Sequence, residues 1–367
     1  MRNKIKLGII FGGRSGEHEV SLMSARSVLS VIDRKKFDLT EIGITRQGQW
    51  LIGENLLSKF EQNDYSQLIP AHILPSPQNP GVYICSNDGL SLYSALDVVF
   101  PVMHGSFSED GSIQGLLELA DLAYVGAGIL GSAVCMDKGL FKDLMKTHHI
   151  PILPYHVFNR SEVNEDLDRC VQSVEKISNY PLFTKPANLG SSVGINKCKD
   201  SKELTKGLIE AARYDRRILV EKGLHSPREI EVSILGNENP IVSVPGEVVP
   251  KDIFYTYAEK YINDTAELVF PADLPTEVST QIQELSIKAY RAADCAGMAR
   301  VDFLIDRETN ELYLSEINTI PGFTTISMYP KLWEASGIPY SLLIEKLIDL
   351  ALQRKQTRDQ LEREYQG

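Results

Sequence analysis

Residues 312–322 read LYLSEINTIPG, a strand followed by a tight turn. Its leucine and isoleucine side chains indicate a strand with an apolar, core-facing side, and a proline–glycine turn follows. Glu316 and Asn318 are two residues apart, so in a pleated strand their side chains point to the same face. Two oxygen ligands on one face predict a metal site at the end of this strand.

A second strand just upstream, Met298–Ile305, repeats the pattern, because Arg300 and Asp302 are also two residues apart among apolar neighbours. A carboxylate in a single strand is more often a solvent-facing or edge residue. Two such strands in tandem are harder to explain in that way, since pairing them collects Asp302, Glu316 and Asn318 into one oxygen-rich cluster. Mg²⁺ prefers carboxylates together with substrate phosphate, so the sequence predicts a Mg²⁺ site with Arg300 pointing into the same space.

Composition limits the classes of function. The chain has 367 residues, 43% of them hydrophobic, and a formal net charge of −11. This length predicts two or three domains, and the charge argues against a nucleic-acid or anionic-membrane surface, which would need basic patches. The five scattered cysteines predict free thiols in a reducing compartment. Because no apolar run reaches membrane length, we expect a cytoplasmic protein that binds neither nucleic acid nor membrane.

Strands alternate with helices up to about residue 125. The apolar run Ile5–Phe11 leads through a glycine turn into an expected helix at Glu17–Ile32, and the strand Asp97–Met103 leads into His104 and another helix. This alternation predicts a doubly wound α/β domain whose ligand edge lies at the C-terminal ends of its strands. Taken alone, the glycine turn is a weak nucleotide motif, Glu17 suits a helix start, and His104 suits a structural hydrogen bond.

Lys185 and the loop after it suggest a phosphate site. The lysine ends an apolar strand, and the loop Asn188–Gly194 is rich in glycine and serine. Such loops are common in ordinary hairpins, but here a point cation stands beside free backbone N–H groups, which predicts a lid over nucleotide phosphates. The long segment Pro250–Phe270 is a surface loop or a second lid. Further helices are expected at Lys138–Thr147, Ser161–Ser178, Lys199–Tyr214, Thr276–Cys295 and Pro339–Leu352.

Taken together and in order, these motifs resemble those of the ATP-grasp ligases, and among them the D-alanine–D-alanine ligases. The similar segments are the opening GGRSGEHEVS, the HGSFSEDG that begins at His104, and EINTIPG within residues 312–322. The resemblance implies the ATP-grasp fold, an α/β fold in which an N-terminal doubly wound domain is followed by two α+β domains that enclose ATP. We expect these domains at residues 1–131, 132–223 and 224–367.

The resemblance also implies a reaction, the ATP-dependent ligation of two D-alanines to D-alanyl-D-alanine through an acyl phosphate, for peptidoglycan precursor synthesis. Two Mg²⁺ ions, with Mn²⁺ as a substitute, and a homodimer are implied as well. Three alternatives are a D-alanine–D-lactate ligase of the same family, a nucleotide-binding module without turnover, and a carboxylase-type ATP-grasp enzyme. A nucleotide-binding module without turnover would not need Arg300, Glu17 and a metal site together. A carboxylase-type ATP-grasp enzyme would lack the GEHEVS segment. Tyr261 favours the dipeptide, because lactate-forming members of the vancomycin-resistance type carry histidine at the matching place.

The resemblance implies roles for individual residues at the matching positions. Glu17 would hold the ammonium of the first D-alanine and form a hydrogen-bonded set with Ser191 and Tyr261. Arg300 would stabilise the oxyanion of the tetrahedral intermediate together with the backbone N–H of Gly322. The other substrate residues are His104 for the first D-alanine and Ser327, with Arg300, for the second carboxylate. The residues implied for ATP are Lys138, Lys185, Ser192, Glu221, Leu224, Glu229 and Lys260. The implied metal ligands are Asp302, Glu316 and Asn318.

Overall fold

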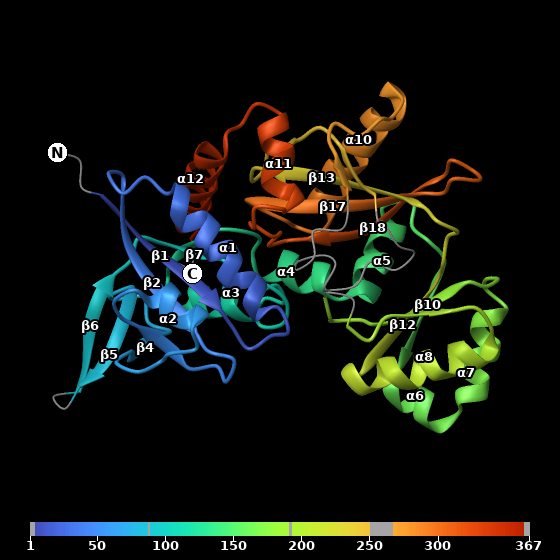
Figure 1. Cartoon of the computed structure of the whole chain (residues 1–367), viewed down its shortest axis with the longest axis horizontal. Coiled ribbons are helices and arrows are strands. Elements are labelled where there is room, and N and C mark those ends of the chain that lie inside the picture. Colours follow the sequence, from blue (N-terminus) through green and yellow to red (C-terminus); the bar gives the residue numbers. More distant parts are fainter. Residues whose placement is uncertain (1–3, 87–88, 191–192, 250–266, 363–367) are drawn as a thin grey trace.

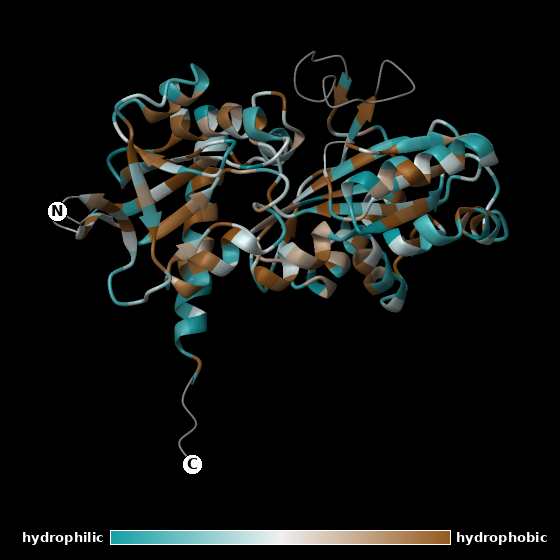
Figure 2. Ribbon diagram, turned by 90° about the horizontal axis from the view of Figure 1, so that it is seen from below, coloured by the Kyte–Doolittle hydropathy of each residue, from teal (hydrophilic) through white to brown (hydrophobic). Residues whose placement is uncertain are grey.

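The computed structural model describes residues 4–86, 89–190, 193–249 and 267–362, and the strands within them form three sheets. Figure 1 shows the N-terminal sheet on the left, the central sheet at the lower right and the C-terminal sheet at the upper right. Hydrophobic residues concentrate along the strands and the helix faces that pack on them, whereas the outer helix faces are mostly hydrophilic (Figure 2). None of the described helices combines the length and apolar composition needed to cross a bilayer.

The N-terminal sheet has eight strands, and its centre is parallel as predicted. β1 (Ile5–Gly12) pairs in parallel with β2 (Phe37–Ile44) and β7 (Val98–Pro101). Its apolar residues from Leu7 to Phe11 are fully buried because both faces of the sheet are covered. The region from residue 69 to residue 95 contributes short antiparallel strands at one edge of this sheet. The remaining elements are β3 (Trp50–Ile52), β4 (Ile69–Ile73), β5 (Gly81–Ser86), β6 (Gly89–Ala95), β8 (Ala123–Tyr124), α1 (His18–Val31), α2 (Leu56–Glu61) and α3 (Ser112–Leu119).

The central sheet has four antiparallel strands and is reached through α4 (Ile129–Met136) and α5 (Lys138–Thr147). Its elements are β9 (Tyr155–Asn159), β10 (Leu182–Pro186), β11 (Asn196–Cys198), β12 (Arg217–Lys222), α6 (Arg160–Glu165), α7 (Leu167–Glu175) and α8 (Ser201–Tyr214). The prediction of one helix over 161–178 is wrong. The chain leaves the helical conformation at Asp166, whose carboxylate accepts the N–H of Arg169 at 3.0 Å and so begins a new helix.

The C-terminal sheet has six strands and contains the predicted antiparallel pair, β17 (Met298–Ile305) and β18 (Leu312–Asn318). Its other elements are β13 (Arg228–Leu235), β14 (Ile241–Val242), β15 (Gly246–Val249), β16 (Glu267–Val269), α10 (Thr276–Ala292) and α11 (Met328–Ala335). Most of the predicted second lid, residues 250–266, lies outside the described residues.

The last helix, α12 (Tyr340–Asp359), extends seven residues beyond its predicted end at Leu352 (359 − 352). The added turns are held by the N-terminal part of the chain. Arg354 donates to the Tyr124 carbonyl at 3.2 Å and stacks 4.2 Å from the Tyr124 ring, and Arg358 pairs with Glu118. The helix therefore packs against the N-terminal sheet, beside α1 in Figure 1, although it follows the C-terminal sheet in sequence.

Candidate active site

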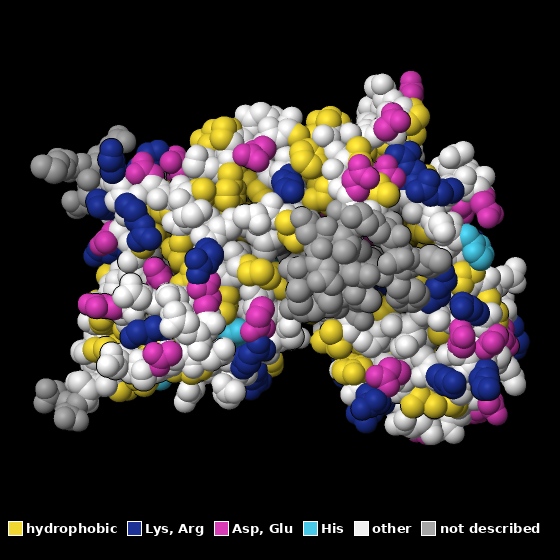
Figure 3. Space-filling view, in the orientation of Figure 1, with side chains coloured by type: hydrophobic (Ala, Val, Ile, Leu, Met, Phe, Trp, Pro, Cys, Tyr) yellow, Lys and Arg dark blue, Asp and Glu magenta, His cyan; other side chains and the backbone are white. Residues whose placement is uncertain are grey.

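A cleft of about 780 Å³ lies where the three sheets approach one another. Figure 3 shows a notch between the N-terminal and central parts of the molecule, on one side of the region where the sheets approach. The cleft is lined by thirteen of the predicted site residues: Glu17, His104, Lys138, Lys185, Glu221, Leu224, Glu229, Arg300, Asp302, Glu316, Asn318, Gly322 and Ser327. The other four, Ser191, Ser192, Lys260 and Tyr261, lie outside the described residues.

The strand pair β17–β18 brings the predicted metal ligands together. Asp302 lies directly opposite Glu316, and Arg300 lies directly opposite Asn318. The Asn318 amide donates to Asp302 Oδ2 at 3.0 Å, so the two side chains share one face of the sheet. Asp302, Glu316 and Asn318 therefore occupy neighbouring positions on the two strands.

A shift in register makes this arrangement possible. Phe303 lies opposite Leu314, so Ser315 is an extra residue in β18. Strict alternation would have turned Leu314 and Glu316 to the same face of the sheet. The bulge at Ser315 separates them: Leu314 and Ile317 remain in the hydrophobic core while Glu316 lines the cleft. This bulge was not predicted from the sequence.

Arg300 is held between carboxylates. Its Nε and Nη2 atoms donate to the two oxygens of Asp302 at 2.7 and 2.6 Å, a bidentate pair. Its Nε also lies 3.1 Å from Glu231 Oε2 on the neighbouring strand β13. No role was predicted for Glu231 from the sequence, although the alternation of polar residues along this strand could have identified it. Glu231 shares a strand face with Glu229, and both line the cleft.

A buried cluster of charges occupies the central side of the cleft. The Glu221 carboxylate pairs with Lys185 on one oxygen and with Lys142 on the other, the second at 2.8 Å. Burial raises the pKa of Glu221, but the two ammonium groups outweigh it and lower this pKa to about 2. Burial lowers the pKa of Lys185, yet Glu221 outweighs burial and raises it. The carboxylate and the Lys185 ammonium are thus both charged at neutral pH.

Lys142 is a residue that the sequence analysis missed. Its side chain is 3% exposed, which is rare for a lysine without a charged partner. It lies one helical turn after Lys138 on α5, so the spacing of the two lysines was a usable signal. The Lys138 ammonium donates to the Leu189 carbonyl at 2.6 Å, at the start of the glycine–serine loop, and burial lowers its pKa.

Glu17 lies between the N-terminal and central parts of the chain. A Cβ atom at Gly105 would come within 2.5 Å of Glu17 Oε2, and one at Gly190 within 3.1 Å, so the carboxyl group rests against both glycines. Glu109, which the sequence analysis also missed, accepts the N–H of Gly105 at 3.1 Å. Burial and the neighbouring Glu17 hold the pKa of Glu109 well above its usual range.

The turn after β18 completes the cleft. A Cβ atom at Gly322 would lie 2.6 Å from Ser327 Oγ, so a residue with a side chain could not occupy position 322 without moving Ser327. Ser327 Oγ accepts the N–H of Thr324 at 3.0 Å and lines the cleft beside Gly322. His104 lines the same end, and burial lowers its pKa to about 4.

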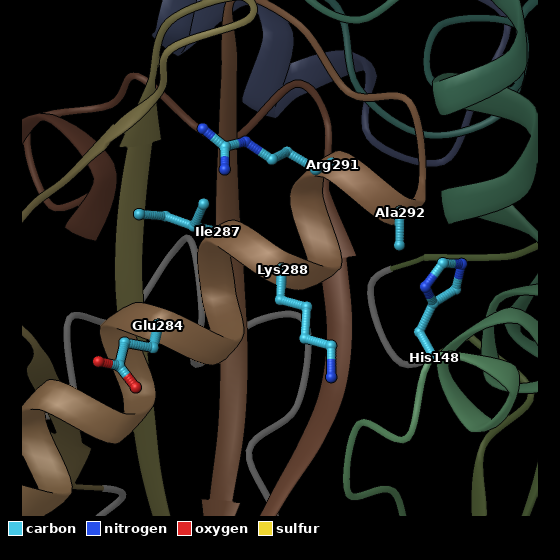
Figure 4. Close-up of a pocket in the computed structure, with 6 residues that line it drawn as sticks. All are labelled: His148, Glu284, Ile287, Lys288, Arg291 and Ala292. Carbon is cyan, nitrogen blue, oxygen red and sulfur yellow. The ribbon is translucent and has the colours of Figure 1, made fainter.

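A second hollow of about 530 Å³ lies outside the cleft, along α10 and the turn after α5 (Figure 4). Its lining residues are His148, Glu284, Ile287, Lys288, Arg291 and Ala292. Their charged side chains are exposed to solvent, and none of the predicted site residues belongs to this set.

Comparison with known proteins agrees with this geometry. A family model described as D-ala D-ala ligase N-terminus matches residues 6–127, and one described as D-ala D-ala ligase C-terminus matches residues 144–349. The D-alanine–D-alanine ligase of Natranaerobius thermophilus is 46% identical over 361 residues, covering 97% of this chain and 97% of that protein. The D-alanine–D-alanine ligase of Thermoanaerobacter pseudethanolicus is 49% identical over 352 residues, covering 95% and 97%.

Solved structures with the same fold include two ligases. The D-alanine-D-alanine ligase from Coxiella burnetii has a TM-score of 0.82 and 36% identity, covering 97% of this chain and 96% of its own. The VanG D-Ala:D-Ser ligase from Enterococcus faecalis has a TM-score of 0.85 and 34% identity, covering 95% and 100%. The three sheets around a cleft of lysines and carboxylates thus have the ATP-grasp ligase fold, which confirms the predicted fold class. Within that class, the chain belongs to the D-alanine–D-alanine ligase family.

The buried cluster predicts the effect of Lys142→Met. Removing one partner of a buried ion pair leaves charge uncompensated, so we expect the free energy of unfolding to fall by about 3 kcal/mol, measured by chemical denaturation. Lys146→Met is the matched control, because Lys146 lies one turn later on α5 and is exposed. Equal stability of the two variants would contradict a structural role for the Lys142–Glu221 pair.

Proposed function

We propose that this chain joins two molecules of D-alanine to D-alanyl-D-alanine with conversion of ATP to ADP and phosphate, through an acyl phosphate. The observation that carries the proposal is one cleft lined by an acid for an ammonium group, lysines for phosphates, and the Arg300–Asp302–Glu316 face. The names of relatives that cover nearly the whole chain support the same reaction. Three domains at 1–131, 132–223 and 224–367 remain part of the proposal, supported by one sheet in each.

The nucleotide would bind on the central side of the cleft. Lys138 and Lys185 present ammonium groups where phosphate oxygens would lie, and Lys260 and Ser192 would complete the clamp from segments outside the described residues. The Glu221 carboxylate is paired with two lysines, so we infer that it orients Lys185. The backbone next to Glu221 would then contact the adenine. Leu224 would pack on the base, and Glu229 would bind the ribose.

Asp302, Glu316 and Asn318 fit Mg²⁺, since their oxygen atoms belong to adjacent paired residues on one face and leave room for phosphate oxygens. Bound there, two Mg²⁺ ions, or Mn²⁺ in their place, would neutralise charge on the β and γ oxygens of ATP. Asp302 is bound by Arg300, so it would divide its oxygens between the guanidinium and the metal.

Both chemical steps can be written with residues of this chain. Glu17 would hold the ammonium of the first D-alanine, with His104 lining that site and Ser191 and Tyr261 linked to it. The carboxylate of this substrate attacks the γ-phosphate of ATP, and ADP leaves. The amine of the second D-alanine, whose carboxylate Ser327 and Arg300 would hold, then attacks the acyl phosphate and expels phosphate. Arg300 and the N–H of Gly322 would stabilise the oxyanion that forms in this second step.

The wider setting follows from the reaction. A dipeptide of D-alanine is a precursor of peptidoglycan, so we propose a role in cell-wall biosynthesis, in the cytoplasm, where ATP is available. We also propose a homodimer formed through the N-terminal domain, as the family resemblance implies.

Replacing Glu316 with glutamine tests the metal face. An amide cannot balance the metal charge, so Glu316→Gln should lower the rate of D-alanine-dependent phosphate release by at least about a hundredfold while the protein stays folded. Glu311→Gln, an exposed change in the connection between β17 and β18, is the control and should keep the wild-type rate. A folded Glu316→Gln variant with wild-type turnover would remove Glu316 from the metal site.

The second substrate is tested at Tyr261. We expect the wild type to prefer D-alanine over D-lactate near pH 7, because a tyrosine remains neutral there and does not repel the incoming ammonium. Tyr261→His should raise depsipeptide formation relative to dipeptide, most clearly at mildly acidic pH, where histidine is charged. The products are measured by mass spectrometry from mixtures of D-alanine with D-lactate or D-serine. A wild type that makes mainly a D-lactate or D-serine product at pH 7 would overturn the preference.

A further inference from the structure

Ser24 is a buried polar residue that the proposed reaction does not use. It lies on α1, two turns after Glu17, and the spacing of seven residues puts the two side chains on the same side of the helix. Its exposed fraction is 0%. A hydroxyl group in such a place costs free energy unless it is hydrogen-bonded, so its partners explain why it is there.

The partners of Ser24 come from two distant parts of the chain. Its Oγ atom lies 3.0 Å from His104 Nε2 and accepts the backbone N–H of Phe323 at 3.2 Å. His104 Nδ1 lies 3.2 Å from the carbonyl oxygen of Ile320. One helix, one strand end and the turn after β18 are therefore joined by a continuous chain of hydrogen bonds.

The positions of the protons in this chain follow from the chemistry of its ends. The carbonyl of Ile320 can only accept, so His104 Nδ1 carries the hydrogen. In a neutral imidazole Nε2 is then an acceptor, and the Ser24 hydroxyl donates to it while accepting from Phe323. Burial, which lowers the pKa of His104 to about 4, agrees with a neutral ring at pH 7. Both ring nitrogens are thus occupied by protein groups.

The chain of bonds holds the turn on both sides of Gly322. Ile320 is bound through its carbonyl group and Phe323 through its N–H group, and Gly322 lies between them against Ser327. We propose that Ser24 is a positioning residue for ligation: with His104 it fixes residues 320–323 so that the N–H of Gly322 faces the reacting carbonyl. This inference rests on the proposed function, because it needs Gly322 to act as an oxyanion donor. It gives His104 an orienting role in place of a direct polar contact with D-alanine.

The kinetic test uses Ser24→Ala with two companion variants. An oxyanion donor is effective only when it is held in place, so Ser24→Ala should lower kcat for dipeptide formation about tenfold and leave the KM for ATP within about twofold. Ser24→Cys keeps a weak donor and acceptor of similar shape and should recover part of kcat. Ser286→Ala is the matched control, since its hydroxyl is equally buried and donates within α10, to the Ile282 carbonyl at 2.7 Å.

A second measurement does not depend on activity. Nitrogen-15 spectra of the histidine rings, with the His104 signals identified by their loss in His104→Gln, should show a proton on Nδ1 and none on Nε2 in the wild type at pH 7. In Ser24→Ala the Nε2 signal should shift, because its donor is gone.

The possible results separate the positioning role of Ser24 from the proposed function. A wild-type His104 with its proton on Nε2, or a Ser24→Ala variant whose kcat matches that of Ser286→Ala, would overturn the positioning role. If Ser24→Ala does not fold, two other results decide the positioning role: the proton position in the wild-type His104 ring and the kcat of Ser24→Cys. A proton on Nε2, or a Ser24→Cys variant whose kcat matches that of Ser286→Ala, would overturn it. A folded wild type that forms no dipeptide would instead refute the proposed function, even with the predicted proton on Nδ1.

Discussion

The pairing of β17 with β18, offset by one residue at Ser315, determines which side chains reach the cleft. Upstream of the offset the strand buries Leu314, and downstream of it Glu316 faces the opposite side. Without the extra residue, the carboxylate would point into the apolar core, where a charge is very costly. The placement of Glu316 beside Asp302, and of the turn that carries Gly322, depends on this local break in an otherwise regular sheet.

Electrostatics then divide the cleft into two ends. At the central end, one buried carboxylate, Glu221, neutralises part of a group of three lysines, which leaves net positive charge where triphosphate oxygens would bind. At the C-terminal end, the carboxylates of Glu231, Asp302 and Glu316 outnumber the guanidinium of Arg300 beside them, which leaves net negative charge suited to a metal ion. The two ends are complementary to ATP and Mg²⁺ respectively, and Glu17 lies where the N-terminal and central parts meet.

Much of this site could be predicted from sequence, because the strands carry polar residues at spacings of two among apolar neighbours and the loops carry glycine in fixed motifs. The bulge at Ser315 could not, since it depends on which residues the neighbouring strand places opposite. Lys142 and Glu231 were missed because a lysine on a helix and a glutamate on a strand are usually solvated. The extension of α12 was not predicted because the charged residues after Leu352 are typical of a solvated tail. The partners of Arg354 and Arg358, Tyr124 and Glu118, lie more than two hundred residues earlier in the chain.

In the proposed reaction, the carboxylate of the first D-alanine is activated in the cleft as an acyl phosphate. Isotope transfer tests it most directly: D-alanine labelled with oxygen-18 in its carboxylate is incubated with ATP and Mg²⁺, and the released phosphate is analysed by mass spectrometry. A carboxylate oxygen that attacks phosphorus remains bound to it when the amine displaces phosphate from the carbonyl carbon. The account predicts one labelled oxygen in the phosphate for each dipeptide formed. Dipeptide accompanied by unlabelled phosphate would contradict it.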